Sequence, residues 1–449
     1  MKEFPVQTAL TIVALGLLLM AAHRLQPSIW GPALADFAHL IDFGGGVEPA
    51  AVTAPTRHPA APKAPHRVVL LDDSESVLDY FYAALSRRGA NAVTRVVHYG
   101  DSPTTADLIT GDVRSLLQKQ FGNAGHGFIL LEQPWAWYQH YGVKLLSFGW
   151  HPTPATLFRV QDGLFGLGGV TFTGMAPTRT HYSMESGRHS YLEVWFLRRP
   201  GGGLLSLSSG NRKLAEVDTA TDETSSGFWS TVADPPVSEF DVTVERGEVR
   251  AFGVVAETGD RGVVYDSLGL NGGATSVLAR IFNAAHWTEQ LRHRNPDLVV
   301  INYGTNEADF GDFIEKEYKF ELREAIRRVR VALPKASILI MSPMDRGHWA
   351  GPGLIETLPT IPRIVEIQSV IAHEMRCAFF NTFEAMGGEG SVARWYRMAP
   401  PLVAADLIHP HPAGAKTIAS SLVKELLVGL ARYQSHRETP QVGAAGAIQ

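Results

Sequence analysis

The spacing of apolar residues changes twice along the chain. From about residue 67 to 148, runs of strand type alternate with segments in which apolar residues recur every three or four positions. Between about 149 and 258 apolar and polar residues alternate, as in the run YLEVWFL at 191–197. From 259 to about 434 the first pattern returns. Because a period near 3.6 predicts helices and a period of 2 predicts half-buried strands, the middle region is a different structural unit.

The two flanking regions predict a parallel sheet covered by helices. Runs with strand character are followed by helical patterns, which is typical of a doubly wound sheet whose sites form beyond the carboxyl ends of the strands. The expected strands are 93–99, 263–265, 297–303, 337–341 and 377–380. The expected helices are one capped by Ser74 and ending near Arg88, then 104–121, 275–292, 320–333, 364–375 and 413–433.

The middle region, 149–258, predicts an antiparallel β-sandwich inserted into that α/β domain. Its strands are expected at 191–197, 204–207 and 240–244, and no amphipathic segment of helix length interrupts them. The pairs Arg246-Gly247 and Gly259-Asp260 are expected as hairpin turns between such strands. The α/β domain is therefore split in the sequence into 67–148 and 259–434.

The N-terminus predicts export or membrane anchoring. The segment from Val6 to Ala22 is largely apolar, so residues 1–24 are interpreted as a signal anchor or a signal peptide, with the uncleaved anchor favoured. A cleavable signal with the site Ala33-Leu34-Ala35 and a buried core helix are the alternatives. Residues 25–66 are rich in Pro, Ala and Gly and are expected as a linker, and 435–449 as a flexible tail. The body is expected in the periplasm or otherwise outside the cytoplasm.

Composition narrows the class of protein. The 449 residues carry Lys+Arg 40 against Asp+Glu 45, a formal net charge of -5, which argues against a nucleic-acid binder. The chain has 43 glycines and 27 prolines, which is too many for a helical bundle. The single cysteine, Cys377, excludes a disulfide within the chain.

Two short motifs offer a nucleophile and a backbone donor after predicted strands. Gly100-Asp101-Ser102 places a hydroxyl at a strand-to-helix turn, where backbone N–H groups supply positive potential, although a serine there is more often only a cap. The turn at 269–274 lets backbone N–H groups approach a ligand through Gly272, with Gly273 as an alternative and an ordinary tight loop as the plain interpretation.

Two further motifs offer an amide donor and an acid–base pair. Asn306 in the motif Gly-Thr-Asn-Glu follows the strand expected at 297–303, although an asparagine in a turn usually bonds its own backbone. Asp406 precedes His409 by three residues, a spacing that lets the carboxylate orient the imidazole toward a nucleophile. The competing interpretation is a metal site of His409 and His411, with His373 or His348, but no further ligand set completes it.

In this order the four motifs resemble the SGNH hydrolases, also called the GDSL-like esterase superfamily. The letters of that name match Ser102, Gly272, Asn306 and His409, with Asp406 as the companion acid. The run HYGDSPTTADLITGDVRSLLQKQFGNAGHGF is similar to the first block of bacterial peptidoglycan O-acetylesterases and O-acetyltransferases, which also carry a β-sandwich between the first two blocks. The resemblance spans roughly residues 68–433. It implies a three-layer α/β/α domain of flavodoxin-like type with an inserted sandwich.

The resemblance implies a serine esterase acting on an acetylated cell-envelope glycan. Ser102, Asp406 and His409 are expected to be catalytic, and Ser102, Gly272 and Asn306 to form the oxyanion hole, with no metal and no cofactor. An O-acetyltransferase with the same triad and a silent glycan-binding scaffold are the alternatives. An envelope acetylation machinery is an expected partner, as is the membrane through the N-terminal segment.

Several other residues near these motifs receive structural interpretations. Asp101 is expected to brace its turn, and Asp345 receives no role. The aromatic cluster of Trp135, Trp137 and Tyr138 is expected in the core, with stacking on a sugar as the alternative.

Overall fold

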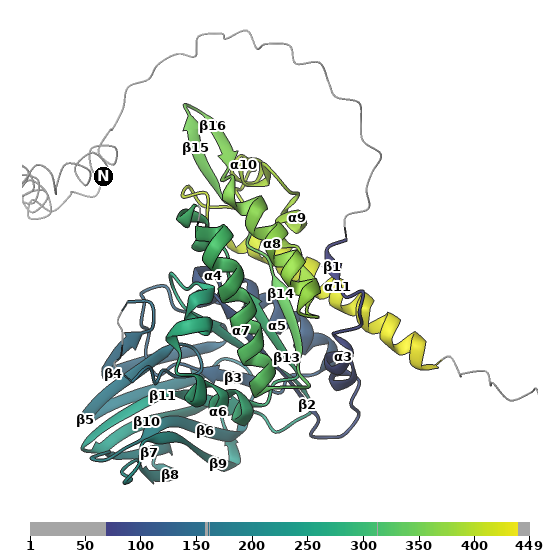
Figure 1. Cartoon of the computed structure of the whole chain (residues 1–449). Helices are drawn as coiled ribbons and strands as arrows, with labels where there is room; N and C mark the ends of the chain where they lie inside the picture. Colours follow the sequence, from purple (N-terminus) through teal and green to yellow (C-terminus); the bar gives the residue numbers. More distant parts are fainter. Residues whose placement is uncertain (1–68, 158–159, 161, 312, 439–449) are drawn as a thin grey trace, which may run out of the picture. The chain divides into compact units, whose positions relative to one another are not determined.

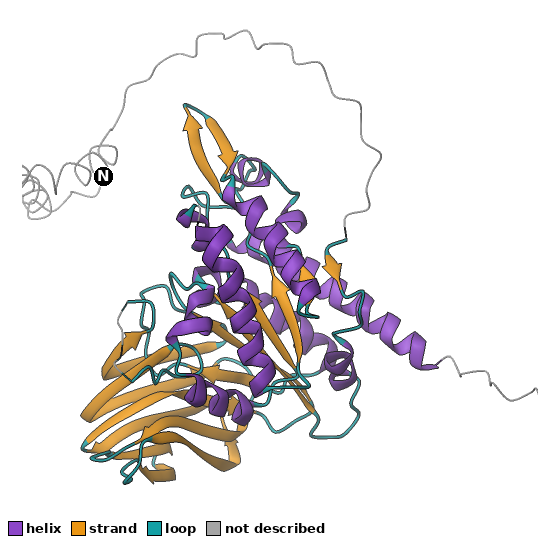
Figure 2. Ribbon diagram, in the orientation of Figure 1, coloured by secondary structure: helices purple, strands orange, loops and turns teal. Residues whose placement is uncertain are grey.

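The computed structural model describes residues 69–157, 160, 162–311 and 313–438, which are built around a parallel sheet and a larger antiparallel sheet (Figures 1 and 2). The first has six strands in the order β1-β17-β14-β13-β2-β12. Their bounds are Leu71–Asp72, Ala378–Phe380, Ser337–Met341, Leu298–Asn302, Val93–Gly100 and Gly262–Gly269 in that order. All neighbours are parallel except β1 and β17. Numbered along the chain, the five parallel strands have the flavodoxin-like order 2-1-3-4-5.

Helices cover both faces of this sheet, because its strands are apolar on both sides. In β13, Leu298 and Val300 join one core, whereas Val299 and Ile301 join the other. The first core is covered by α3 (Asp79–Leu85), α5 (Leu108–Phe121) and α11 (Pro412–Glu438). The second is covered by α6 (Ala284–Arg294), α7 (Lys319–Ala332) and α8 (Thr360–Glu374). The predicted three-layer α/β/α fold is confirmed.

The second sheet is antiparallel and has nine strands in the described residues. Its main path is β8-β7-β10-β5-β11-β6-β9, while β3 pairs with β11 and β4 with β5. The strands are β3 Gly125–Ile129, β4 Val143–Pro154, β5 Val170–Met184, β6 His189–Arg198, β7 Leu204–Ser209, β8 Arg212–Asp218, β9 Ser225–Val237, β10 Glu239–Arg246 and β11 Glu248–Glu257. The predicted antiparallel insertion is therefore present, and β3 and β4 begin before residue 149.

The core of this sheet is continuous with the core beneath α6, α7 and α8. Phe128 of β3 and Trp195 of β6 are buried and meet edge to face, with ring centroids 5.3 Å apart. Both belong to the same apolar cluster as Val299 and Ile301 of the parallel sheet. The antiparallel sheet is thus held against the site-bearing domain by shared apolar packing.

Several local predictions were wrong, each for a physical reason. Ser74 does not cap α3, since Asp73 Oδ1 accepts the Leu78 N–H at 3.0 Å and the helix begins later. The helix expected at 104–121 begins at Ser102 and breaks at Asp107, whose φ is 52°. The helix expected at 275–292 is interrupted before α6, because Asn283 accepts the His286 N–H and starts a new helix. Gly259-Asp260 connects β11 to β12, which lie in different sheets, so it is not a hairpin turn.

Other small elements escaped prediction because they are short. They are β1, the two-stranded β15–β16 hairpin with strands Gly347–Gly351 and Leu354–Thr357, α9 (Thr382–Met386) and α10 (Ser391–Tyr396). Each spans less than two helical turns or only a few strand residues, so periodicity gives little signal for it.

A cluster of three buried histidines, on β3, on β6 and in the loop before β4, lies within the antiparallel unit and predicts sensitivity to acid. His126 Nδ1 lies 3.0 Å from His189 Nε2, and His140 Nε2 lies 3.1 Å from the His126 carbonyl oxygen. Burial lowers the pKa of His126 to about 2, of His140 to about 3 and of His189 to about 4. Since the unfolded chain binds these protons near pH 6.5, folding stability is lost as pH falls below that value.

The free energy of unfolding is therefore expected to decrease between pH 7 and pH 5. Each neutral histidine contributes a slope of at most about 1.4 kcal/mol per pH unit. His140→Gln should make this decrease smaller, measured by urea denaturation at both pH values, because it removes one such proton-binding group. An unchanged pH dependence in the variant would contradict this account.

Candidate active site

The turn after β2 presents Ser102 at the carboxyl edge of the parallel sheet. β2 ends at Gly100 and the short helix α4 (Ser102–Thr105) starts two residues later. Gly100 leaves no room for a side chain, since a Cβ there would lie 2.1 Å from Thr104 Oγ1. The Ser102 N–H lies in the first turn of α4, where backbone N–H groups have no acceptor within the helix. The end of the strand, the tight turn and the beginning of the helix thus place a hydroxyl and a backbone N–H donor close together.

His409 and Asp406 approach this hydroxyl from the loop before α11. His409 Nε2 lies 2.7 Å from Ser102 Oγ, and His409 Nδ1 lies 2.7 Å from Asp406 Oδ2. A carboxylate only accepts, so the proton is assigned to Nδ1 and the free lone pair of Nε2 faces the serine hydroxyl. This is the arrangement in which an imidazole takes a proton from a serine.

Backbone donors hold the Asp406 carboxylate in place. Its Oδ1 accepts the N–H groups of Ile408 and His409, each at 3.0 Å. Partial burial raises the Asp406 pKa, but hydrogen bonds from the His409 ring and from these N–H groups outweigh it and keep the pKa below the ordinary value. Leu407, which lies between Asp406 and Ile408 in the chain, has φ 59°, a strained conformation that closes the loop. Asp406 therefore stays ionised and orients the ring.

The loop after β12 and the loop after β13 place the other two predicted donors together. Gly273 donates its N–H to the Leu270 carbonyl at 2.7 Å, so this group is already used. The Gly272 N–H has no acceptor within the described residues, and its φ of 67° suits a glycine. Asn306 Nδ2 donates to the Gly273 carbonyl at 2.8 Å, which leaves its second N–H free for a ligand. This arrangement favours Gly272 over Gly273 as the donor.

Glu307 fixes these two loops to each other, a role that the sequence did not reveal. Its buried carboxylate accepts the Thr275 N–H and hydroxyl, both at 2.8 Å, and the Gly304 N–H at 3.0 Å. Burial raises its pKa. Its position directly after Asn306 was the available signal, but nothing in the sequence marked Thr275 as its partner. Glu307 is a positioning residue for the donors.

Asp101 and Asp345 are both buried and structural. The main-chain carbonyl of Asp101 accepts the N–H of Thr105 at 3.0 Å. Burial raises its pKa to about 7, and a hydrogen bond from Thr305 opposes that shift. Asp345 Oδ2 accepts the Val392 N–H at 2.8 Å and so holds the start of α10.

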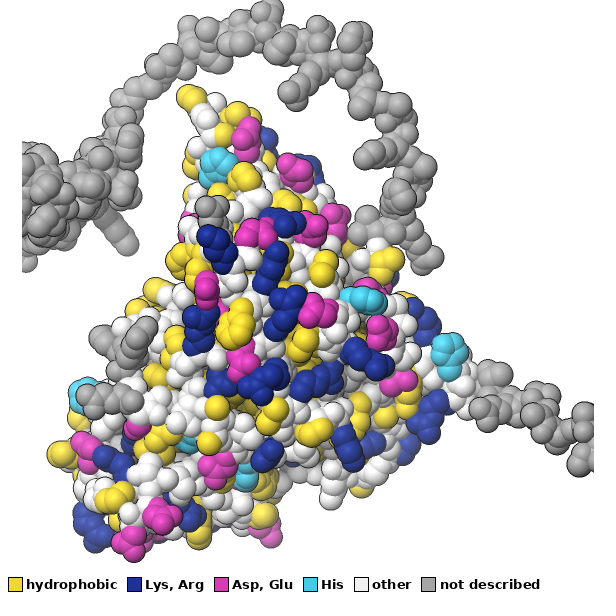
Figure 3. All heavy atoms as spheres, viewed as in Figure 1, with side chains coloured by type: hydrophobic (Ala, Val, Ile, Leu, Met, Phe, Trp, Pro, Cys, Tyr) yellow, Lys and Arg dark blue, Asp and Glu magenta, His cyan; other side chains and the backbone are white. Residues whose placement is uncertain are grey.

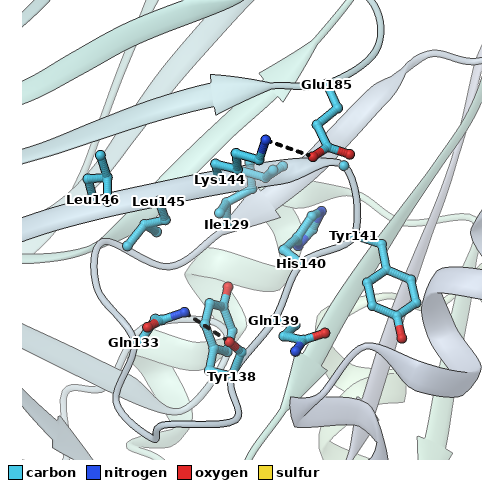
Figure 4. A pocket seen from close by; sticks show the side chains of 12 residues that line it. Ile129, Gln133, Tyr138, Gln139, His140, Tyr141, Lys144, Leu145, Leu146 and Glu185 are labelled. Carbon is cyan, nitrogen blue, oxygen red and sulfur yellow. Dashed lines mark hydrogen bonds and ion pairs between the residues drawn. The ribbon is translucent and has the colours of Figure 1, made fainter. Parts of the chain in front are cut away.

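The aromatic cluster before β4 is divided between core and surface. Trp135 and Tyr138 are buried, as expected, whereas Trp137 is 49% exposed. Beside them lies a pocket of about 480 Å³ between this loop and β4, lined by residues such as Tyr138, His140 and Lys144 (Figure 4). None of the predicted site residues lines this pocket. The Ser102 site is therefore separate from this pocket.

The metal interpretation finds no support in the geometry. Both ring nitrogens of His409 are engaged, one by Asp406 and one by Ser102. Within the described ranges no three His, Cys, Asp or Glu side chains are grouped so that they could hold a metal ion. His348, His373 and His411 therefore do not complete a site with His409.

Comparison with known proteins places this geometry in a family context. The family model described as GDSL-like Lipase/Acylhydrolase family matches residues 224–417, which include Gly272, Asn306, Asp406 and His409. This part of the chain is therefore similar to the GDSL-like lipases and acylhydrolases. Ser102 precedes the matched range. A search of curated proteins found no match.

One solved structure shares the fold of this chain. A peptidoglycan O-acetylesterase superposes with a TM-score of 0.70 at 19% identity, covering 81% of this chain and 100% of that chain. A family two carbohydrate esterase from Clostridium thermocellum has a TM-score of 0.28 at 11% identity, covering 63% of this chain and 99% of that chain. The first likeness establishes the fold, including the antiparallel insertion.

Proposed function

We propose that this chain is a serine esterase that removes O-acetyl groups from a cell-envelope polysaccharide. The observation that carries the proposal is the continuous hydrogen-bonded series from Ser102 through His409 to Asp406. Gly272, whose N–H is free, and Asn306, whose amide keeps one free N–H, lie on the loops after β12 and β13, the two strands that flank β2. A nucleophile, a base, an orienting acid and oxyanion donors in one place are the components of acyl transfer through a covalent intermediate.

The reaction follows from these positions. His409 Nε2 takes the hydroxyl proton as Ser102 Oγ bonds to the acetyl carbon, and the carbonyl oxygen becomes an oxyanion held by the N–H groups of Ser102, Gly272 and Asn306. The carbon–oxygen bond to the sugar then breaks, and His409 returns the proton to the sugar oxygen. Water then attacks the acetyl-serine while His409 takes one of its protons. The bond between the acetyl carbon and Ser102 Oγ breaks, His409 returns the proton to that oxygen, and acetic acid leaves and ionises to acetate.

The exposure of the site supports a large substrate. The side chains of His409 and Asp406 are 42% and 46% exposed, so the acid–base pair is open to solvent and a polymer can reach it. The neighbour of the same fold acts on peptidoglycan, which supports an acetylated glycan as the substrate class. An acetylated polysaccharide is thus the favoured substrate.

We also propose that the enzyme acts outside the cytoplasm, next to an envelope acetylation machinery. The support is the apolar segment at 6–22, which lies outside the described residues. Among the residues that the structure describes, no helix is long and apolar enough to span a membrane.

Two products separate the esterase from its alternatives. The purified chain is given a chromogenic acetyl ester with and without an oligosaccharide acceptor, and both acetate and acetylated sugar are quantified. Acetate release that ignores the acceptor supports the esterase, whereas acetyl groups diverted to the sugar identify a transferase. Absence of both products would favour a silent glycan-binding scaffold.

Asn306→Ala is expected to lower kcat by roughly 10²- to 10³-fold with little change in KM, because an oxyanion donor acts mainly in the transition state. The measurement is a steady-state titration with the acetyl ester. Asn211→Ala, in the exposed turn between β7 and β8, is the matched control and should be unchanged. A loss confined to KM would show that Asn306 only shapes the loop through Gly273.

A further inference from the structure

The β15–β16 hairpin is attached to both loops that carry the candidate site. The Arg346 side chain, just before β15, donates to the Thr305 carbonyl at 2.9 Å and lies 2.8 Å from Asp309 Oδ1. Thr305 is the neighbour of Asn306. On the other side, the Gly347 N–H donates to the Leu407 carbonyl at 3.0 Å, within the loop from Asp406 to His409. The start of the hairpin is therefore hydrogen-bonded both to the loop that carries Asn306 and to the loop that carries Asp406 and His409.

The hairpin is also braced along its length. At its base, Thr357 Oγ1 donates to the buried Asp345 at 3.2 Å and accepts the Gly390 N–H at 2.8 Å. At its turn, Arg397 donates to the Gly353 carbonyl at 2.9 Å. An isolated two-stranded hairpin is marginal in water, so these contacts hold it in one position. The hairpin projects from the α/β domain, as Figures 1 and 2 show.

The hairpin and the segment after α10 expose apolar side chains. Trp349 on β15 is 52% exposed, and its ring meets Tyr396 edge to face with centroids 5.7 Å apart. Leu354 and Met398 are about as exposed. Figure 3 shows hydrophobic side chains on the projecting end of the molecule. Tyr396 fixes the indole of Trp349 while leaving about half of it open, which is the geometry of a stacking platform.

We propose that the β15–β16 hairpin is a substrate arm, on which Trp349 stacks against a sugar ring of the same glycan chain that presents its acetyl group to Ser102. This inference rests on the proposed function. A glycan is the expected occupant because the arm begins beside the candidate site. It shares hydrogen bonds with the loops that carry Asn306 and His409. An amphipathic sugar ring has the apolar face that suits an exposed indole, and its hydroxyl groups remain in water.

The arm predicts a distinction between polymeric and small substrates. Trp349→Ala in the full chain should raise KM for O-acetylated peptidoglycan strands about tenfold, because one stacked ring is lost. The kcat/KM for 4-nitrophenyl acetate should stay unchanged, since this ester carries no sugar ring to stack on Trp349. Trp349→Phe should retain most of the affinity. Trp229→Ala, an exposed tryptophan on β9 of the antiparallel sheet, is the matched control.

A binding measurement separates this inference from the proposed catalysis. Ser102→Ala is combined with Trp349→Ala, and the affinity of each protein for the same strands is measured by co-sedimentation. The expected result is a loss of about tenfold in the double variant. Equal affinity would overturn the arm even if Ser102-dependent hydrolysis of the small ester is observed. An equal loss of activity on both substrates would instead assign Trp349 to folding. A change of molar mass in light scattering would assign it to self-association. Either result would also overturn the proposed substrate arm.

Discussion

Ser102→Ala is expected to abolish measurable hydrolysis of acetyl esters, with a loss of roughly 10⁴- to 10⁶-fold in kcat. The variant keeps His409, Asp406 and the oxyanion donors, but it has no oxygen to bond to the acetyl carbon. In the described residues Ser102 Oγ bonds only His409, so the fold should be retained. Initial rates with a chromogenic acetyl ester, compared with the uncatalysed reaction, give the measurement.

The control for this variant is Ser115→Ala. Ser115 is exposed on α5, so its loss removes a hydroxyl of the same kind away from the site. It should keep full activity. If Ser102→Ala retained most of its rate while remaining folded, another nucleophile would carry the reaction and the proposed mechanism would be wrong.

Asp406→Asn is expected to lower kcat by roughly 10⁴-fold, the size of loss that follows when an imidazole is held in the wrong tautomer. The N–H groups of Ile408 and His409 both point at Oδ1. They fix the asparagine oxygen there and turn its NH₂ group toward His409 Nδ1. Nδ1 must then accept a hydrogen bond, so the ring proton moves to Nε2. Because Nε2 faces Ser102 and is now protonated, it cannot take the proton of the Ser102 hydroxyl.

The same argument predicts that the fold tolerates this substitution. The asparagine oxygen keeps both backbone hydrogen bonds of the loop, so thermal unfolding should change little. Asp260→Asn removes an equal charge in an exposed turn and serves as the control. Near-normal activity in Asp406→Asn would mean that His409 is oriented by other groups.

The sequence predicted the fold through burial patterns. Strands such as β13 are apolar on both faces and helices such as α7 on one stripe, so their types and order could be inferred, and with them the shared edge on which Ser102, Asn306 and His409 lie. Periodicity reports that a face is buried but not which strand is its neighbour. For this reason the link at Gly259 was assigned to one sheet although it joins two.

The contacts that tune the site could not be predicted. Glu307 joins Thr275 and Gly304, which are 29 residues apart in the chain, and only the folded structure reveals this pairing. The choice between Gly272 and Gly273 depended on which N–H is already used within its own turn. The β15–β16 hairpin has few residues and little periodicity, so its position beside the site emerged only from its contacts with Thr305 and Leu407.

The most direct test of the central claim is to trap the acetyl-enzyme. The wild-type chain is mixed with an excess of a chromogenic acetyl ester, quenched in acid within the first turnovers, digested and examined by peptide mass spectrometry. The account predicts a mass gain of one acetyl group on Ser102, absent from the Ser102→Ala variant. Turnover without an acetylated Ser102 peptide, or acetylation of another residue that keeps pace with turnover, would contradict it.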